Sequence, residues 1–229
     1  MHLKFTINLD FRCNHPGLET RGIKFFHLKD YRFLFSGYKV VNCDVFGQET
    51  GLFTPSIIKM IVFITGGARS GKSRFAQDMA LKLSTAPVYL ATAKIWDQDF
   101  QERVNRHKAE RGSEWTNYEA YKDLHQLPLQ GRVVVIDCVT LWLTNFFMDC
   151  DNDLEKSLHM FQQEISNLIN LDATFIIISN ELGMGLHADT AVGRKFTDLQ
   201  GWANQYVASV AEEAIFIVSG LPLYLKKQL

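Results

Sequence analysis

One stretch decides the fold: Met60-Ile61-Val62-Phe63-Ile64-Thr65-Gly66-Gly67-Ala68-Arg69-Ser70-Gly71-Lys72-Ser73. A short apolar, β-branched run ends in a glycine-rich turn, and the residues that follow have helical spacing. Residues 66–73 fit the pattern G-x-x-x-x-G-K-[ST], with a strand expected before it and a helix after it. This order of strand, glycine loop and helix predicts a phosphate-binding loop.

Each residue type in the loop has a chemical reason to be there. Glycines let successive backbone N–H groups converge on an anion, and the helix N-terminus adds partial positive charge. Lys72 is placed to reach β- and γ-phosphates, and the Ser73 hydroxyl is a Mg²⁺ ligand. The alternative is a glycine-rich turn that binds nothing, which the complete motif and both flanks disfavour. We therefore predict nucleotide contacts, with Lys72 also catalytic, from Gly66, Gly67, Ala68, Arg69, Ser70, Gly71, Lys72 and Ser73.

The composition is that of a globular protein. The chain has 229 residues, 47% of them hydrophobic, and a formal net charge of −1. That charge argues against binding nucleic acid or anionic membranes through bulk electrostatics. The four cysteines show no paired metal-binding spacing, and no apolar run approaches the roughly 20 residues of a membrane span. We expect a cytoplasmic protein with reduced thiols, no nucleic-acid partner and no membrane span.

Residues 1–59 do not share the pattern of the rest of the chain. Aromatic patches alternate there with Gly, Asn and charged residues, and no periodicity persists. One interpretation is a small accessory element, such as a hairpin around residues 31–41. The other is an over-extended reading frame in which Met60 is the true start. We expect this N-terminal extension to be poorly ordered or loosely packed, without catalytic residues, and the catalytic domain to span residues 60–229.

From Met60 onward, apolar runs typical of buried strands alternate with segments of helical spacing. Strands are expected at 60–65, 88–91, 132–137, 174–179 and 214–218, helices at 73–84, 98–111, 140–148, 154–171 and 190–211, and short extended pieces at 115–119 and 221–226. This alternation predicts an α/β domain with a mostly parallel sheet and helices on both faces. Ligands of such sheets bind beyond the carboxyl ends of the strands.

Asp137 directly follows a continuous apolar run, at the place where a carboxylate supports Mg²⁺ directly or through water. The alternative role is an N-cap for the helix expected near Thr140. The phosphate-binding loop upstream favours the metal role, so Ser73 and Asp137 are the predicted Mg²⁺ ligands.

His107 lies on a predicted polar helix, with Arg103 and Arg111 four residues away on the same face. The arginines are able to hold phosphates, and their charge disfavours the imidazolium form of the histidine. A neutral imidazole nitrogen is a nucleophile for phosphorus. A solvated basic face, offset by nearby carboxylates, is the alternative. The residues alone leave both open.

A series of motifs occurs in the order found in one enzyme family. They are Gly66-Gly67-Ala68-Arg69-Ser70-Gly71-Lys72-Ser73, Arg103-x-x-x-His107-x-x-x-Arg111-x-x-x-Trp115, Asp137-Cys138-Val139-Thr140-Leu141-Trp142-Leu143-Thr144-Asn145, Asn180-Glu181-Leu182-Gly183-Met184-Gly185, Arg194-x-Phe196-x-Asp198-x-x-Gly201-x-x-Asn204-Gln205 and Ser219-Gly220-Leu221-Pro222. From Met60 nearly to the C-terminus, the chain resembles the bifunctional adenosylcobinamide kinase / adenosylcobinamide-phosphate guanylyltransferases of cobalamin (vitamin B12) assembly. Many NTPases share the first motif, but the whole series is far more specific.

The resemblance implies a RecA-like P-loop NTPase fold, often a homotrimer, that uses ATP, GTP, Mg²⁺ and a corrinoid substrate. An NTP γ-phosphate would move to the aminopropanol hydroxyl of adenosylcobinamide. His107 would then attack the α-phosphate of GTP, and GMP would pass from the histidine to cobinamide phosphate. Glu119 would suit the guanine edge. The implied nucleotide contacts are Ala93, Lys94, Ile95, Glu110, Arg111, Gly112, Ser113, Glu119 and Asp137.

Other functions stay open at this level. One is a different P-loop small-molecule kinase in which His107 is structural, and another is a GTP-binding regulatory protein. The general base of the kinase step is also open, between Asp137 and Glu181.

Overall fold

The computed structural model describes residues 59–94 and 111–227. They hold a seven-stranded sheet in the order β3-β2-β4-β5-β1-β6-β7. Every neighbouring pair is parallel except β6 and β7. The strands are β1 (Met60–Thr65), β2 (Val88–Ala91), β3 (Thr116–Glu119), β4 (Val133–Asp137), β5 (Thr174–Ile178), β6 (Glu213–Val218) and β7 (Leu221–Lys226).

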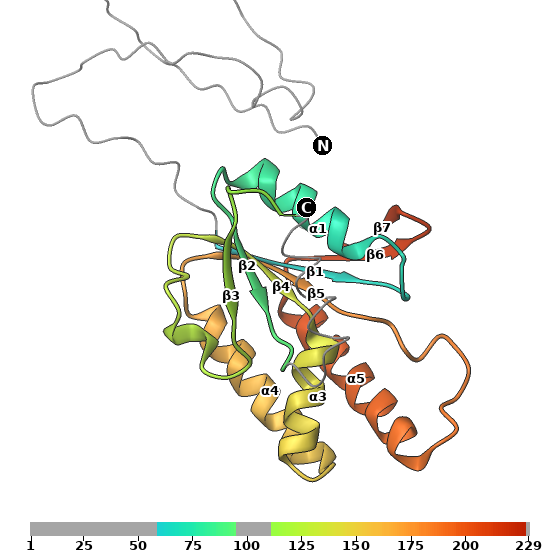
Figure 1. Ribbon diagram of the computed structural model, residues 1–229. Helices are drawn as coiled ribbons and strands as arrows, with labels where there is room; N and C mark the ends of the chain where they lie inside the picture. Colours follow the sequence, from blue (N-terminus) through green and yellow to red (C-terminus); the bar gives the residue numbers. More distant parts are fainter. Residues whose placement is uncertain (1–58, 95–110, 228–229) are drawn as a thin grey trace, which may run out of the picture. The chain divides into compact units, whose positions relative to one another are not determined.

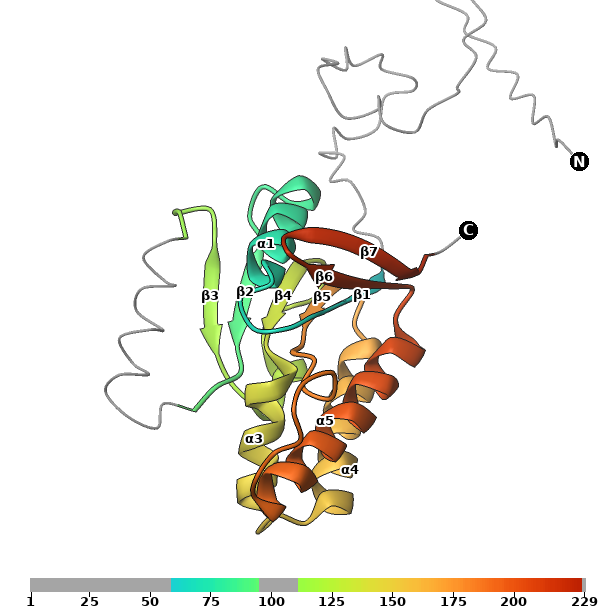
Figure 2. The ribbon, with the colours of Figure 1, turned by 90° about the vertical axis from the view of Figure 1, so that its right-hand side faces the viewer.

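Helices cover both faces of the sheet (Figure 1). They are α1 (Lys72–Leu83), α3 (Val139–Asp149), α4 (Leu154–Ile169) and α5 (Ala191–Val210), with a short 3₁₀ helix η2 (Leu124–Gln126). Helix α1 lies on one face, whereas α3, α4 and α5 lie together on the other, as Figure 2 also shows. The predicted α/β fold with a mostly parallel sheet and helices on both faces is confirmed.

The central strands β1, β2, β4 and β5 are apolar on both sides because each side meets a layer of helices. Along β1, Ile61 and Phe63 belong to the core beneath α3, α4 and α5, and Val62 and Ile64 belong to the core beneath α1. The carboxyl ends of the strands are therefore fixed by packing on both faces.

The C-terminal piece expected at residues 221–226 is an antiparallel edge strand, β7. A two-residue turn joins it to β6, and both turn residues, Ser219 and Gly220, have positive φ angles of 52° and 80°. This backbone matches the twist of a tight hairpin. The side chains of β7 are exposed along its whole length.

The predicted features of residues 1–58 and the helix expected at 98–111, apart from its last residue, lie outside the described residues. Within the described part of the chain, no helix has the length and apolar content needed to cross a membrane.

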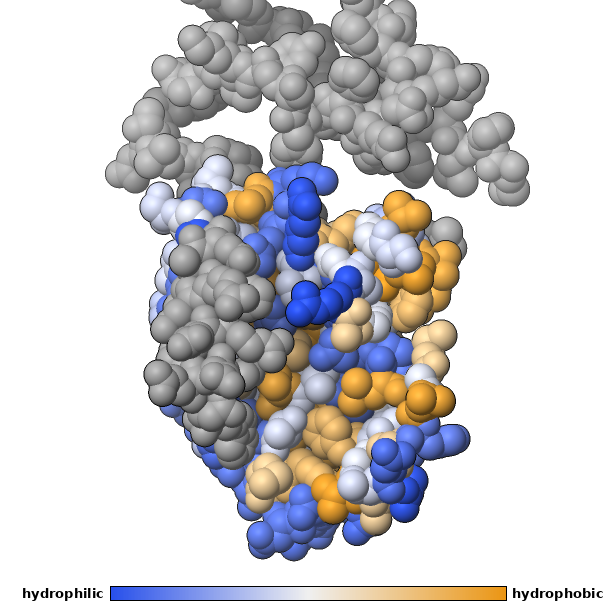
Figure 3. All heavy atoms as spheres, turned by 45° about the vertical axis from the view of Figure 1, so that its right-hand side comes forward, coloured by the Kyte–Doolittle hydropathy of each residue, from blue (hydrophilic) through white to orange (hydrophobic). Residues whose placement is uncertain are grey.

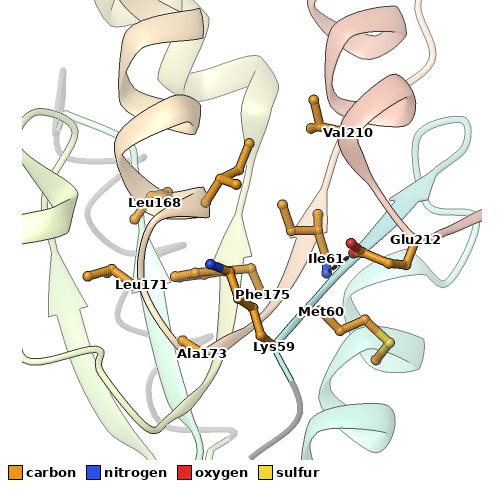
Figure 4. A pocket seen from close by; sticks show the side chains of 10 residues that line it. Lys59, Met60, Ile61, Leu168, Leu171, Ala173, Phe175, Val210 and Glu212 are labelled. Atoms are coloured by element: carbon orange, nitrogen blue, oxygen red, sulfur yellow. Dashed lines mark hydrogen bonds between the residues drawn. The ribbon is translucent and has the colours of Figure 1, made fainter.

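A small cavity of about 40 Å³ lies at the amino end of β1 (Figure 4). Apolar side chains such as Leu168 and Phe175 form much of its wall. Glu212 also lines it, and the Glu212 Oε2 atom accepts a hydrogen bond of 2.6 Å from the Ile61 amide. Because the glycine loop follows the other end of β1, this cavity is separate from the predicted nucleotide site.

Candidate active site

The glycine loop leaves the carboxyl end of β1 and is held by the segments on both sides of it. The Glu181 amide, just beyond β5, donates to the Gly66 carbonyl at 3.0 Å, and the Gly220 amide of the β6–β7 turn donates to the Ser70 carbonyl at 2.9 Å. Gly66 has a φ of +154°, and an added Cβ would lie 2.3 Å from the Ile217 carbonyl oxygen. The backbone path of the loop therefore requires glycine at this position.

Lys72 begins α1 and is buried, with only 7% of its surface exposed. Its ammonium donates a 2.6 Å hydrogen bond to the Gly67 carbonyl. Burial lowers the pKa of Lys72, against the opposing influence of Cys138 and Asp137. A bound phosphate would compensate the buried charge, as expected of a P-loop lysine.

Asp137 ends β4 and accepts two hydrogen bonds on the same oxygen, Oδ2. Ser73 Oγ donates one at 3.1 Å, and the Tyr89 hydroxyl donates a short one. The N-cap of α3 is Cys138, and no side chain caps that helix. The alternative role of Asp137 as N-cap is therefore not observed.

Ser73 and Asp137 supply a hydroxyl and a carboxylate oxygen side by side, which are the ligand types that Mg²⁺ prefers. Among the residues that the structure describes, no group of three or more His, Cys, Asp or Glu side chains gathers as a metal site.

Tyr89 is a site residue that sequence reasoning missed, because it sits in an apolar strand and looks like a core residue. It is 6% exposed. Burial, together with the nearby Asp137 carboxylate, raises the pKa of Tyr89 far above its ordinary value, so the phenol remains a hydrogen-bond donor. Its only sequence signal was a hydroxyl-bearing aromatic two residues before the end of β2.

Arg111 stacks on the same tyrosine. Its guanidinium carbon lies 3.7 Å from the centroid of the Tyr89 ring, and its Nε donates a 2.8 Å hydrogen bond to Asn117 Oδ1. Arg111 Nη1 is buried and has no hydrogen-bond partner among the described residues. Because buried charged donors are normally paired, this N–H group indicates a place for an anion.

The segment after β2 is clamped by a buried asparagine of α3. Asn145 donates through Nδ2 to the Thr92 carbonyl at 2.6 Å and accepts through Oδ1 from the Lys94 amide at 3.4 Å. The Lys94 ammonium pairs with Asp149 at 2.9 Å. The backbone around Ala93 and Lys94 is thus fixed at the carboxyl edge of the sheet.

A buried polar network fixes the segment after β5. Asn204 Oδ1 accepts from Ser179 Oγ at 2.6 Å and from Gln200 Nε2 at 2.9 Å, and Asn204 Nδ2 donates to the Asn180 carbonyl at 3.1 Å. Asn180 Nδ2 donates in turn to Thr140 Oγ1 at 3.1 Å. Helices α3 and α5 therefore set the backbone from which Glu181 holds the glycine loop.

The predicted site residues fall into three groups. The carboxyl edge brings together the glycine loop, Ala93, Lys94, Glu119 and Asp137, and the Arg111 side chain joins them through Tyr89. Exposed Gly112 and Ser113 instead precede β3, at the opposite end of that strand from Glu119. The remaining predictions, Ile95, His107 and Glu110, lie outside the described residues.

Comparison with known proteins gives a consistent family match. Residues 62–225 match the family model described as cobinamide kinase / cobinamide phosphate guanyltransferase. The bifunctional adenosylcobalamin biosynthesis protein CobP of Pseudomonas aeruginosa is 36% identical over 167 residues, covering 71% of this chain and 95% of that protein. The CobU protein of Escherichia coli is 32% identical over 182 residues, covering 73% and 100%.

The fold also has a structural neighbour outside this family. A prototypical ATPase from the type III secretion system of pathogenic bacteria superposes with a TM-score of 0.50 and 13% identity, over 75% of this chain and 57% of that one. At this identity the likeness concerns the fold alone, and it agrees with the predicted α/β fold with a mostly parallel sheet.

Replacing Gly66 by alanine should destabilise the nucleotide-free protein by about 3 kcal/mol, because the new Cβ would collide with the Ile217 carbonyl at a strained φ. Gly67→Ala is the matched control, since a Cβ there has nothing within 4 Å. Its cost should stay below about 1 kcal/mol. Urea unfolding without nucleotide measures both, and equal losses would contradict the role given to Gly66.

Lys72→Met should remove one pH-dependent contribution to the free energy of unfolding, the one that comes from titration of the Lys72 ammonium. Because burial holds the folded-state pKa of Lys72 below its ordinary value of 10.5, the unfolded chain binds that proton more tightly. The wild type should therefore gain stability relative to the variant as pH rises from the folded-state pKa toward 10.5.

Urea unfolding of both proteins from about pH 7 to about pH 10 tests this dependence. At the low end of that range Lys72→Met should be at least as stable as the wild type, although it loses phosphoryl transfer. A wild type that loses stability relative to the variant with rising pH would show that the ammonium is not desolvated.

Proposed function

The chain belongs to the cobinamide kinase / cobinamide phosphate guanyltransferase family, and from that premise we propose that one nucleotide pocket performs both transfers in turn. The protein is a bifunctional enzyme of cobalamin biosynthesis. One observation carries the proposal: Asp137 is hydrogen-bonded to Ser73 of the P-loop and, through Tyr89, linked to Arg111. Arg111 belongs to the motif that contains His107, so the P-loop and the histidine segment serve one site.

In the first transfer, the aminopropanol hydroxyl of adenosylcobinamide attacks the γ-phosphorus of ATP or GTP. The bond from that phosphorus to the bridging oxygen breaks, and a nucleoside diphosphate leaves. Lys72 and the backbone N–H groups of the glycine loop stabilise the charge on the phosphate oxygens. Asp137 and Glu181 are the two candidates to accept the hydroxyl proton.

The metal for this chemistry is Mg²⁺, and Ser73 and Asp137 are the residues that would hold it. When bound, Mg²⁺ neutralises phosphate charge and orients the leaving group. The support for this assignment is the 3.1 Å contact between the Ser73 hydroxyl and the Asp137 carboxylate.

In the second transfer, an imidazole nitrogen of His107 attacks the α-phosphorus of GTP, and pyrophosphate leaves as the α–β bridging bond breaks. A phosphate oxygen of cobinamide phosphate then attacks the same phosphorus, and the P–N bond breaks as GMP is transferred. Arg111 Nη1, which is buried and has no hydrogen-bond partner among the described residues, supports a phosphate beside this segment. Glu119 at the end of β3 is the proposed partner of the guanine N–H groups, with base contacts from Ala93, Lys94 and Ile95.

The proposed location is the cytoplasm. The cysteines among the described residues, Cys138 and Cys150, are both free thiols, which fits a reducing compartment.

GTP labelled at the α-phosphate should transfer its label to the wild-type protein as a phosphoramidate, stable to alkali and labile to acid. His107→Ala should abolish this label, whereas His159→Ala, on the exposed surface of α4, should retain it. Absence of label in the wild type, or undiminished label in His107→Ala, would overturn the guanylyl-transfer mechanism.

The same variants separate the bifunctional enzyme from a simple kinase. His107→Ala should still consume NTP in the presence of adenosylcobinamide, because γ-phosphate transfer does not use the histidine. Failure of the wild type to consume NTP in response to adenosylcobinamide would instead favour a GTP-binding regulatory protein.

We also propose a homotrimer, assembled through the β6–β7 hairpin. Figure 3 shows hydrophobic side chains gathered on the surface at this hairpin. These large apolar residues are 47–69% exposed: Val218, Leu221, Leu223, Tyr224 and Leu225. Apolar surface on an unpaired edge strand is typical of a protein interface.

Leu223→Asp in β7 should convert the trimer into monomers, because a buried, unpaired carboxylate disfavours an apolar interface. Leu81→Asp on α1, also an exposed leucine, should leave the trimer intact. Light scattering coupled to size-exclusion chromatography reads the mass directly. A monomeric wild type would rule out the proposed assembly, and a trimeric Leu223→Asp would place the interface elsewhere.

A further inference from the structure

Tyr89 touches both parts of the proposed site. Its hydroxyl donates a hydrogen bond to Asp137, and the Arg111 guanidinium stacks on its ring. We propose that Tyr89 is a positioning residue with two separable roles: its hydroxyl fixes the Asp137 carboxylate beside Ser73, and its ring fixes Arg111 as a second phosphate-binding group. This inference rests on the proposed function and adds to it the residue that joins the two phosphate sites.

The first role belongs to the hydroxyl. The Tyr89 hydroxyl and Ser73 Oγ both donate to Asp137 Oδ2, so neither occupies Oδ1. Two donors on one oxygen restrain rotation of the carboxylate and keep the direction of Oδ1 fixed. A phenylalanine at position 89 would leave the Ser73 bond alone to orient this group.

The second role belongs to the ring. Asn117 is the register neighbour of Tyr89 on β3, so the Arg111 guanidinium rests on the ring at 3.7 Å while its Nε is held by Asn117 at 2.8 Å. Trp115 meets the Tyr89 ring edge-on, with centroids 6.0 Å apart. The guanidinium is thereby held in one orientation, with its buried Nη1 left for an anion.

Stacking and the Nε contact both need a planar guanidinium, so lysine would reproduce the charge of Arg111 but not its orientation. Tyr89 is itself set by the sheet, because its strand pairs with β3 on one side and with β4 on the other. The positions of the Asp137 carboxylate and of the Arg111 guanidinium therefore both depend on how these three adjacent strands pair.

The two roles are separated by Tyr89→Phe, which keeps the ring, and Tyr89→Leu, which removes both ring and hydroxyl. Tyr118→Phe is the matched control, since Tyr118 lies on the neighbouring strand and packs against the opposite core. One readout is kcat for phosphorylation of adenosylcobinamide. The other is calorimetric affinity for a GTP analogue with a methylene between its α- and β-phosphates, measured in EDTA, where no metal contributes.

Tyr89→Phe should lower kcat roughly tenfold or more through loss of a charge-assisted hydrogen bond. Its metal-free analogue affinity should stay within about twofold of the wild type, because the Arg111 stack remains. Tyr89→Leu should weaken that affinity roughly 3- to 30-fold, the range expected for a lost cation–π contact. Tyr118→Phe should match the wild type in both readouts.

A Tyr89→Phe variant equal to the wild type in kcat would overturn the hydroxyl role. Equal affinity losses in Tyr89→Phe and Tyr89→Leu would overturn the ring role. If Tyr89→Leu does not fold by circular dichroism, Arg111→Lys replaces it and should show the same metal-free loss of affinity; unchanged affinity would refute the stacking role.

The wild type in the same assays distinguishes a failure of the Tyr89 inference from a failure of the proposed function. A wild type that neither phosphorylates adenosylcobinamide nor takes label from GTP refutes the proposed function, and the metal-free titrations still decide whether Tyr89 orients Arg111. An active wild type matched by Tyr89→Phe in kcat, and by Tyr89→Leu in metal-free affinity, refutes the Tyr89 inference alone.

Discussion

The close approach of the Gly66 backbone to its neighbours is the constraint on which the site depends. The loop after β1 passes between the ends of β5 and β6, and amide groups from both sides fix its carbonyls. A side chain at position 66 would occupy the space of the Ile217 carbonyl. The segment after β5 is held by α5, and the Gly220 turn is part of the β6–β7 hairpin. The phosphate-binding loop is therefore fixed by contacts to elements on both sides of β1.

Most of the fold follows from local patterns. Apolar runs of strand length, separated by segments with helical spacing, predicted the parallel sheet and the helices on both faces, because strands buried on both sides leave a clear signature. The glycine motif predicted the loop, and the position of Asp137 at the end of β4 predicted that its carboxylate would lie beside Ser73. Each of these features is set by residues close together in sequence.

What the sequence did not reveal depends on contacts between distant segments. Tyr89 and Asp137 are 48 positions apart, and nothing in the apolar run around Tyr89 distinguishes it from a packing residue. The network of Ser179, Gln200 and Asn204 likewise joins the segment after β5 to a helix more than 20 positions further along the chain. The order of strands, which places β2 beside β4, creates the contact between Tyr89 and Asp137, and the packing of α5 against the sheet creates the network; no local pattern encodes either. The role of His107 stays a prediction.

The buried ammonium of Lys72 affects how stable the protein is without nucleotide. A cation held away from water destabilises the empty enzyme, and a bound nucleotide supplies the missing countercharge. Ligands that bind only the folded state shift the folding equilibrium in proportion to their concentration. A bound nucleoside triphosphate is therefore expected to stabilise the folded enzyme, and loss of nucleotide should raise the unfolded fraction that proteases can cleave.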